Sequence, residues 1–216
     1  MCVHSINDDI PSHEILAQKT AWYMLQRIRS CFGIENYNEL EGVVEADEAF
    51  YGGLNKNRHK RKKIPQSQGR ACVDKTPVLG LVQREGKLTA VVTKDTSVKS
   101  LQPIIKKYIK PQTVLITDDW KGYRNMPEYN HCVIKNYAKQ KIYDNTIHTN
   151  NIEGAWKIMK NILRDMYNSV SRKYLQIYVD EFVFRYNTRE MKCGVRFNYL
   201  LLNSNIRTKY KDLIYV

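Results

Sequence analysis

The sequence contains few cysteines and no long apolar run. Its five cysteines are scattered, and no pair shows the C-x-x-C spacing of a zinc ribbon. This pattern argues against a structural zinc site and a disulfide framework, and it favours a reducing compartment. No apolar stretch is long enough to cross a membrane, and the polar N-terminus, with Asp8 and Asp9, is unlike a secretory signal. We therefore expect a soluble protein that has no membrane partner.

Acidic residues are the scarcer charged class, with 22 Asp and Glu against 35 Lys and Arg, which leaves a net charge of +13. Such an excess of cations attracts phosphate backbones, so nucleic acid is the leading candidate partner. The densest basic segment, 55–70, has no acidic residue and contains Pro65 and Gly69, which predicts an exposed loop. We expect this loop to contact DNA; a solvated loop without a specific role and a nuclear localisation signal are the alternatives. Its cations are Lys56, Arg58, Lys60, Arg61, Lys62, Lys63 and Arg70.

One predicted amphipathic helix presents an acid and a base on its polar side. Apolar residues recur at helical spacing over 152–166, which predicts a face packed on a core, and the pair 149–150 can cap the start of the helix. Glu153 and Lys160 are seven residues apart and project from the same polar face, with Trp156 beside them. A carboxylate and a cation in this arrangement suit a metal ion and a phosphate. An exposed Glu and Lys on an ordinary surface helix are the alternative.

Two apolar runs end in carboxylates. The runs 42–47 and 113–118 are predicted strands that end on Asp47 and Asp118. If these strands are neighbours and Glu153 faces them, the three like charges are costly unless hard divalent cations neutralise them. We therefore expect the three carboxylates to converge on Mg²⁺ or Mn²⁺, as a pair of ions that activates the attacking oxygen and steadies the leaving oxygen at phosphorus.

The first predicted helix covers 12–29, with Leu25 and Ile28 on its core face. Its other face could lie along DNA as the second helix of a helix-turn-helix, and a plain packing helix is the alternative. Too few residues precede Ser12 to supply the supporting helices, so we interpret 1–40 as a helical segment and a candidate truncated helix-turn-helix. The residues of the face assigned to DNA are Lys19, Gln26, Arg27 and Arg29.

The periodicities along the rest of the chain predict alternating strands and helices. In order, the predicted elements are strands at 42–47, 77–83 and 88–93, a helix at 97–109, a strand at 113–118, a short helical or turn segment at 120–125, a strand at 131–135, the helix that carries Glu153, a long helix at 173–189 and a weakly helical tail after 191.

Five motifs are spread along this pattern: Val44-Glu-Ala-Asp-Glu-Ala-Phe-Tyr-Gly-Gly53, Lys75-Thr-Pro-Val-Leu-Gly80, Thr117-Asp-Asp-Trp-Lys-Gly-Tyr123, His148-Thr-Asn-Asn-Ile-Glu-Gly-Ala-Trp-Lys-Ile-Met-Lys160 and Tyr178-Val-Asp-Glu-Phe-Val-Phe-Arg-Tyr-Asn187. The order of elements resembles the ribonuclease H-like fold of retroviral integrases and DDE transposases. The 35 positions from Asp118 to Glu153 resemble the interval between the second and third acids of many such enzymes. Over about 20–189, the motifs resemble the insertion-sequence transposases related to the eukaryotic Merlin elements.

The resemblance assigns roles to individual residues. The three metal-binding acids of the family fall on Asp47, Asp118 and Glu153, with Asp119 as a competing choice for the second. The basic residue two helical turns after the third acid falls on Lys160, where an ammonium can contact a phosphate. Arg164 is expected to add a further DNA contact one turn later.

The resemblance also implies an α/β fold, a mixed sheet in the order β-β-β-α-β-α-β-α flanked by helices, with a short N-terminal helical segment and a C-terminal helix. The implied catalytic domain covers 41–190, and 191–216 forms a tail. Glu48 and His148 lie close to the acids in sequence, and we expect both to act as local hydrogen-bonding residues rather than general bases.

The implied activity is DNA transposition. It comprises Mg²⁺-dependent cleavage at transposon ends and attack of the freed 3′-hydroxyl on target DNA, by a homodimer or larger oligomer on double-stranded DNA. A ribonuclease H-like nuclease without strand transfer and a catalytically inactive DNA-binding relic are the alternatives. The expected location is the cytoplasm or nucleoid of a bacterial host, or the nucleus of a eukaryotic one. The zinc ribbon usual in this family has no counterpart here, so we expect salt-dependent duplex binding with little preference for a particular end.

Overall fold

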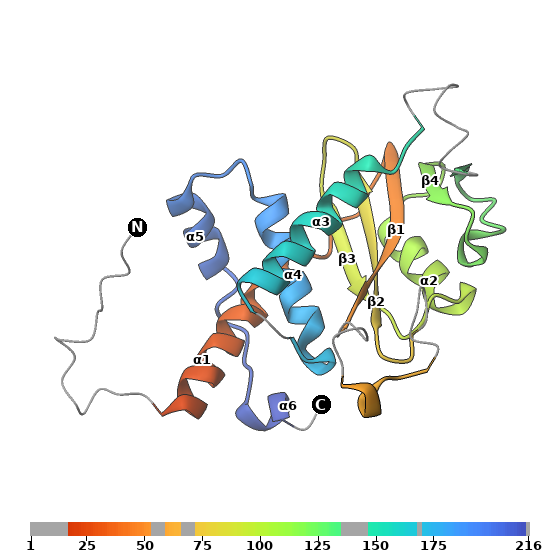
Figure 1. Ribbon diagram of the computed structural model, residues 1–216. Coiled ribbons are helices and arrows are strands. Elements are labelled where there is room, and N and C mark those ends of the chain that lie inside the picture. Colours follow the sequence, from red (N-terminus) through yellow and green to blue (C-terminus); the bar gives the residue numbers. More distant parts are fainter. Residues whose placement is uncertain (1–16, 53–58, 66–71, 135–146, 168–169, 215–216) are drawn as a thin grey trace.

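The computed structural model describes residues 17–52, 59–65, 72–134, 147–167 and 170–214. Within them the chain builds a five-stranded sheet in the order β3-β2-β1-β4-β5 (Figure 1). The strands β1 and β2 pair antiparallel, as do β2 and β3, whereas β4 lies parallel to both β1 and β5. This mixed sheet confirms the predicted α/β architecture. Its strands are β1 (Val43–Tyr51), β2 (Thr76–Gln83), β3 (Leu88–Val92), β4 (Val114–Asp118) and β5 (Asn130–Ile134).

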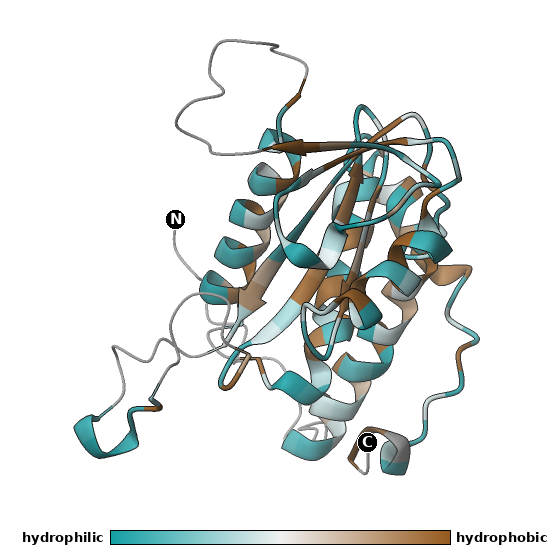
Figure 2. Ribbon diagram, turned by 90° about the vertical axis from the view of Figure 1, so that its right-hand side faces the viewer, coloured by the Kyte–Doolittle hydropathy of each residue, from teal (hydrophilic) through white to brown (hydrophobic). Residues whose placement is uncertain are grey.

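Helices cover both faces of the sheet (Figure 1). One face packs against α2 (Val98–Tyr108), and the other packs against α3 (Asn150–Asp165) and α4 (Leu175–Asn187). The central strands are consequently apolar on both sides, and the helices alternate hydrophilic and hydrophobic bands (Figure 2). No helix in the described part of the chain is long and apolar enough to cross a bilayer. The predicted element order is therefore confirmed, and most boundaries agree to within two or three residues.

The remaining helices gather beyond α3 and α4, away from β4 (Figure 1). They are α1 (Gln18–Ser30), α5 (Cys193–Leu201) and α6 (Tyr210–Ile214), with the 3₁₀ turns η2 (Cys31–Glu35), η4 (Lys60–Lys62), η5 (Lys121–Tyr123) and η6 (Arg172–Tyr174) elsewhere along the chain. The predicted tail after 191 is thus helical over two short stretches. Residues 12–16 of the first predicted helix lie outside the described residues.

Helix α1 packs through two of the four residues that its sequence pattern assigned to DNA, Gln26 and Arg29, whereas Lys19 and Arg27 are exposed. Gln26 is 1% exposed, whereas Leu25 and Ile28 are each 50% exposed, so the predicted core face is wrong. Arg29 forms an ion pair with Glu181 at 3.5 Å, and this contact joins α1 to α4. Its guanidinium also lies over two tyrosine rings, those of Tyr167 and Tyr178, at 5.0 and 4.6 Å. Specific tertiary contacts of polar side chains have overridden the apolar periodicity.

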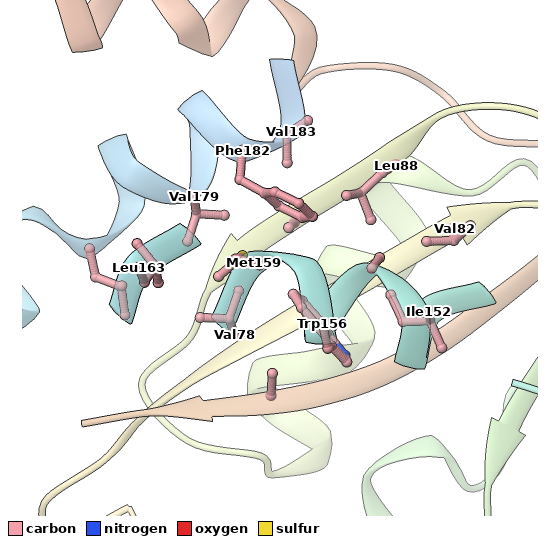
Figure 3. Close-up of a cluster of buried hydrophobic side chains, with 14 residues drawn as sticks. Val78, Val82, Leu88, Ile152, Trp156, Met159, Leu163, Val179, Phe182 and Val183 are labelled. Atoms are coloured by element: carbon pink, nitrogen blue, oxygen red, sulfur yellow. The ribbon is translucent and has the colours of Figure 1, made fainter. Parts of the chain in front are cut away.

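Helix α3 packs on the sheet through an apolar face that is wider than predicted. Trp156 was placed beside the polar residues, but it is 3% exposed and sits between α3 and the strands (Figure 3). Gly80 of β2 makes this possible, because a Cβ there would lie 2.4 Å from the indole ring. Met166, the last residue of the predicted stripe, is instead 57% exposed at the C-cap.

Strand β3 forms one edge of the sheet, and side-chain amides pair with its outer hydrogen-bonding groups. Asn187 of α4 accepts a hydrogen bond from the N–H of Leu88 at 2.8 Å and donates one to its C=O at 2.9 Å. Asn36 bonds Ala90 in the same way, at 2.9 and 2.7 Å. Gln176 Oε1 accepts a hydrogen bond from the N–H of Val92 at 2.7 Å. These amides take the place of a neighbouring strand and fasten α4 to the sheet.

Candidate active site

The first two candidate acids lie on neighbouring parallel strands. The ladder between β1 and β4 runs to Glu45 opposite Ile116, and Asp47 and Asp118 each lie two residues farther along their strands. Side chains alternate along a strand, so both aspartates belong to the face that carries Glu45. That face is covered by α3, because the N–H of Ile152 donates to Glu45. The two strands therefore direct both aspartates to the α3 side of the sheet.

Asp47 is an interior residue of β1 rather than its last residue. The strand continues to Tyr51, because Ala49 and Phe50 pair with Val78 and Pro77 of β2. The prediction that the strand ends at Asp47 is therefore wrong. The correction places Asp47 on a rigid part of the sheet, directly opposite Gly80, and rigid elements hold functional groups more precisely than loops do.

A groove between β1 and α3 brings together the first and third acids and the basic residue. It is lined by Asp47 and Glu48 of β1 and by Glu153 and Lys160 of α3, and its volume is about 460 Å³. Glu153 lies in the first turn of α3, where its Oε1 accepts a hydrogen bond from Thr149 Oγ1 at 3.1 Å. The remaining lining residues are Trp156, Lys157, Asn161 and Arg164.

Asp118 opens onto an adjacent cavity, which it shares with Asp119, Tyr123 and His131. Its Oδ1 accepts a hydrogen bond from the backbone N–H of Trp120 at 3.0 Å, so it forms the first residue of a tight turn. His131 lines this cavity, and burial lowers the pKa of its imidazole. Asp118 thus lines a different cavity from the one that Asp47 and Glu153 line.

Tyr123 lines the cavity of Asp118, and its phenol lies close to the carboxylate of Glu48. It is 1% exposed, and burial raises the pKa of its phenol well above the ordinary value. The negative charges of Glu48, Asp47 and Asp118 raise this pKa further, in that order. All three carboxylates therefore lie within electrostatic reach of one buried hydroxyl group. Glu48 is 7% exposed and lies close to this phenol, and its role as a local hydrogen-bonding residue stays a prediction.

The chemistry of the donors suits a hard divalent cation. Asp47, Asp118 and Glu153 offer only carboxylate oxygens, the ligands that Mg²⁺ and Mn²⁺ prefer. Within the described ranges, however, no group of three or more His, Cys, Asp or Glu side chains is arranged to hold a metal ion. The convergence of the three acids on one pair of ions therefore stays a prediction.

The basic side of the groove is open to solvent. Lys160 and Arg164 are both exposed on α3, one turn apart. Arg164 is engaged by Asp165 through two contacts, Nε to Oδ1 at 2.6 Å and Nη2 to Oδ2 at 3.2 Å. This pairing raises the pKa of Arg164 and lowers that of Asp165. A DNA phosphate would compete with Asp165 for this guanidinium.

Part of the predicted basic loop is described. Lys60, Arg61 and Lys62 form an exposed 3₁₀ turn, and the next residue, Lys63, is also exposed. This exposure agrees with the predicted loop. The other three cations assigned to it, Lys56, Arg58 and Arg70, lie outside the described residues.

Sequence reasoning missed a buried charge cluster beside the groove. Glu45 is 0% exposed, and its Oε1 accepts a hydrogen bond from Arg84 Nε at 2.8 Å. Arg84 Nη2 donates to the backbone carbonyl of His148 at 2.9 Å, and His148 Nδ1 lies 3.5 Å from Glu45 Oε1. His148 Nδ1 also accepts a hydrogen bond from the backbone N–H of Asn150 at 3.4 Å, a local contact of the kind expected for this residue. The detectable signal was an acid two residues before Asp47 in an apolar strand, since a buried carboxylate requires partners.

Comparison with known proteins identifies the family of this chain. Residues 39–187 match the family described as the ISXO2-like transposase domain. An uncharacterized transposase-like protein of Haemophilus influenzae is 26% identical over 111 residues, which cover 50% of this chain and 88% of that protein. No solved structure matches this chain. Since the family match spans more than half of the 216 residues and contains both cavities, the chain belongs to the ISXO2-like transposase domain family.

Proposed function

We propose that this protein is a DNA transposase that cleaves phosphodiesters at transposon ends and then joins each freed 3′ end to target DNA, where its 3′-hydroxyl attacks a phosphodiester and displaces a 3′-hydroxyl of the target strand. The observation that carries the proposal is the family match over 39–187, which includes every residue assigned to the site. The groove that holds Asp47, Glu153 and Lys160 supports it. The finer relation to Merlin elements rests on the five sequence motifs alone.

The proposed roles follow from charge and position. Asp47, Asp118 and Glu153 hold Mg²⁺ or Mn²⁺, with Asp119 as the competing second ligand. When bound, a pair of such ions activates the attacking oxygen and stabilises the leaving one. Lys160, exposed at the mouth of the groove, binds a phosphate of the DNA as a point charge and orients the strand.

Double-stranded DNA is the proposed partner, bound by a homodimer or larger oligomer. The net charge of +13 supplies long-range attraction. Lys60, Arg61, Lys62 and Lys63 form an exposed basic surface within the described part of the loop, and Arg164 extends the basic side of α3. Such contacts give affinity without sequence information, so we expect little discrimination between a transposon end and other duplexes. Gln26 and Arg29 are not part of this surface, because they pack against the protein.

A catalytically inactive DNA-binding relic is the second candidate. It is favoured by one observation: Asp118 lines a different cavity from Asp47 and Glu153. A nuclease without strand transfer would use the same acids, so it differs only in what happens after cleavage.

The test incubates the full chain with supercoiled plasmid, Mg²⁺ or Mn²⁺, and a labelled duplex with a free 3′-hydroxyl. A transposase nicks the plasmid and joins the labelled strand to it, a nuclease only nicks, and a relic does neither. Asp47→Asn, Asp118→Asn and Glu153→Gln should each abolish nicking while retaining duplex binding. Asp119→Asn should retain nicking if Asp118 is the ligand. Cleavage that persists in all three of the first variants would reject the site.

Binding provides a separate test. Lys160→Ala should reduce the slope of log affinity against log salt by about one ion, because one phosphate contact is lost. An unchanged slope with full activity would make Lys160 an ordinary surface residue. Competition between an element end and a scrambled duplex of equal length tests specificity, and a preference of about a hundredfold, roughly 2.7 kcal/mol, would show that this chain reads the end itself.

A further inference from the structure

Glu45 caps helix α3 from a different element. The backbone N–H groups of Asn151 and Ile152, in the first turn of α3, donate to Glu45 Oε2 at 3.0 and 3.1 Å. Thr149 occupies the N-cap position of α3 but makes no side-chain hydrogen bond to the backbone there. The free N–H groups at a helix start carry a partial positive charge, which a carboxylate satisfies. Here strand β1 supplies that carboxylate.

The hydrogen-bonding capacity of the Glu45 carboxylate is filled. Oε2 accepts the two backbone bonds, while Oε1 accepts from Arg84 Nε and from Asn151 Nδ2, each at 2.8 Å. An ionised carboxylate has about four acceptor sites, so these four donors leave no lone pair for a metal ion. Arg84 also supplies the opposite charge that a buried carboxylate requires. Glu45 is therefore a poor candidate for a fourth metal ligand, despite its position beside Asp47.

We infer that Glu45 is a positioning residue that fixes Glu153 relative to Asp47. This inference rests on the proposed function. Asp47 lies two residues beyond Glu45 on the same face of β1, and Glu153 directly follows Ile152, whose N–H Glu45 binds. The two groove acids are thus joined through one short, hydrogen-bonded path.

Repulsion between the two groove acids explains why the start of α3 must be held against β1. Asp47 and Glu153 line one groove and carry like charges, which repel before a cation arrives. The first turn of α3 would relieve this repulsion by moving away from β1. The bonds from Glu45 to Asn151 and Ile152, reinforced by Arg84 and the His148 carbonyl, oppose that movement. The site is thereby arranged in advance for the cation.

The test replaces Glu45 with Gln in the full chain, which keeps the volume but loses the charge and half of the acceptor capacity. Calorimetric titration with Mn²⁺ alone should show affinity reduced 10- to 100-fold, the usual effect of disturbing groups that orient metal ligands. The metal concentration for half-maximal nicking should rise by the same factor. Amide hydrogen exchange should accelerate at Asn151 and Ile152, while duplex binding stays unchanged. Glu41→Gln is the matched control, because Glu41 is exposed and pairs with Lys110 at 2.7 Å.

A milder variant keeps the test decisive if Glu45→Gln does not fold. Asn151→Ala removes the 2.8 Å bond to Oε1 from an exposed residue and leaves both backbone bonds in place. Its effect on Mn²⁺ affinity and on local exchange should have the same direction and be smaller.

Two results would overturn the inference. One is unchanged Mn²⁺ affinity together with unchanged exchange in the first turn of α3. The other is a uniform loss of stability with Mn²⁺ affinity retained, which would make Glu45 purely structural. If the unmodified protein neither binds Mn²⁺ nor nicks DNA, the proposed function fails. The positioning role of Glu45 is then tested by amide hydrogen exchange at Asn151 and Ile152 alone. Unchanged exchange at these two residues in the Glu45→Gln variant would refute that role.

Discussion

At Gly80 the sheet and helix α3 approach each other closely. It lies opposite Asp47 in the β1–β2 ladder and below the indole of Trp156. A Cβ at this position would lie 2.4 and 2.6 Å from two ring atoms of Trp156 and 2.8 Å from Cδ1 of Ile152. Ordinary contacts begin near 3.4 Å, so Gly80→Ala requires a displacement of about 1 Å.

We expect the displacement to involve the backbone of α3. Trp156 is 3% exposed and Ile152 is 0% exposed, so neither side chain can swing into solvent. Overpacking of this kind costs about 1–3 kcal/mol of folding free energy. Lifting α3 also moves Glu153 away from Asp47, and a misplacement of about 1 Å can reduce a catalytic rate about 100-fold.

Two measurements test this prediction: urea unfolding and single-turnover nicking at saturating metal. Gly154→Ala is the matched control, because a Cβ added there would meet no atom within 4 Å apart from its chain neighbours and the helix's own backbone, and alanine should stabilise the helix by about 0.5–1 kcal/mol. Trp156→Phe removes the two overlapping ring atoms, so the Gly80→Ala/Trp156→Phe pair should lose less stability than the sum of the single losses. Full stability and full activity of Gly80→Ala would refute the reasoning, as would strict additivity in the double variant.

Three further predictions concern the edge strand, the groove and helix α2. Asn187→Ala removes both bonds to Leu88 and should lower the free energy of unfolding by about 1–3 kcal/mol in urea titrations; an unchanged midpoint would contradict the role of the amides. Asp165→Asn frees Arg164 and should tighten duplex binding, with a salt slope steeper by about 0.9 in fluorescence anisotropy, whereas equal affinity at every salt concentration would show that Arg164 does not reach DNA. Hydrogen bonds from Ser100 and Ser97 lower the pKa of Asp95 to about 2, so its contribution to stability is present above the ordinary value near 3.9 and lost as pH falls toward 2. Asp95→Asn should flatten the stability profile in that window, and identical acid profiles for the two proteins would contradict the assignment.

The secondary structure was largely predictable because local periodicity reports on it directly. Strand β2 is apolar at successive positions, which is the pattern of a strand buried on both faces, and α2 repeats its apolar residues at helical spacing. The exact end of β1 was not predictable, since the acids at Glu45 and Asp47 resemble the end of an apolar run. Pairing with β2 carries the strand on to Tyr51.

The faces of α1 and α3 were harder to predict, because they depend on what each helix meets. Gln26 is buried and Leu25 half-exposed, an order that hydrophobicity alone would reverse. Trp156 enters the core because Gly80, far away in the sequence, leaves space for its ring. The apolar pattern of a helix does not show where the strand that it packs against lacks a side chain.

The sequence by itself determined the order of strands and helices, the family, and the candidate acids Asp47, Asp118 and Glu153, because these depend on local composition, spacing and motif. Only the tertiary structure decided which of them share a groove, since strand register and helix docking join residues that are distant in the chain. It placed Asp47 and Glu153 together and Asp118 in the adjacent cavity. It also gave Glu45 its partners, because a buried carboxylate is stable only where Arg84 and the start of α3 converge on it.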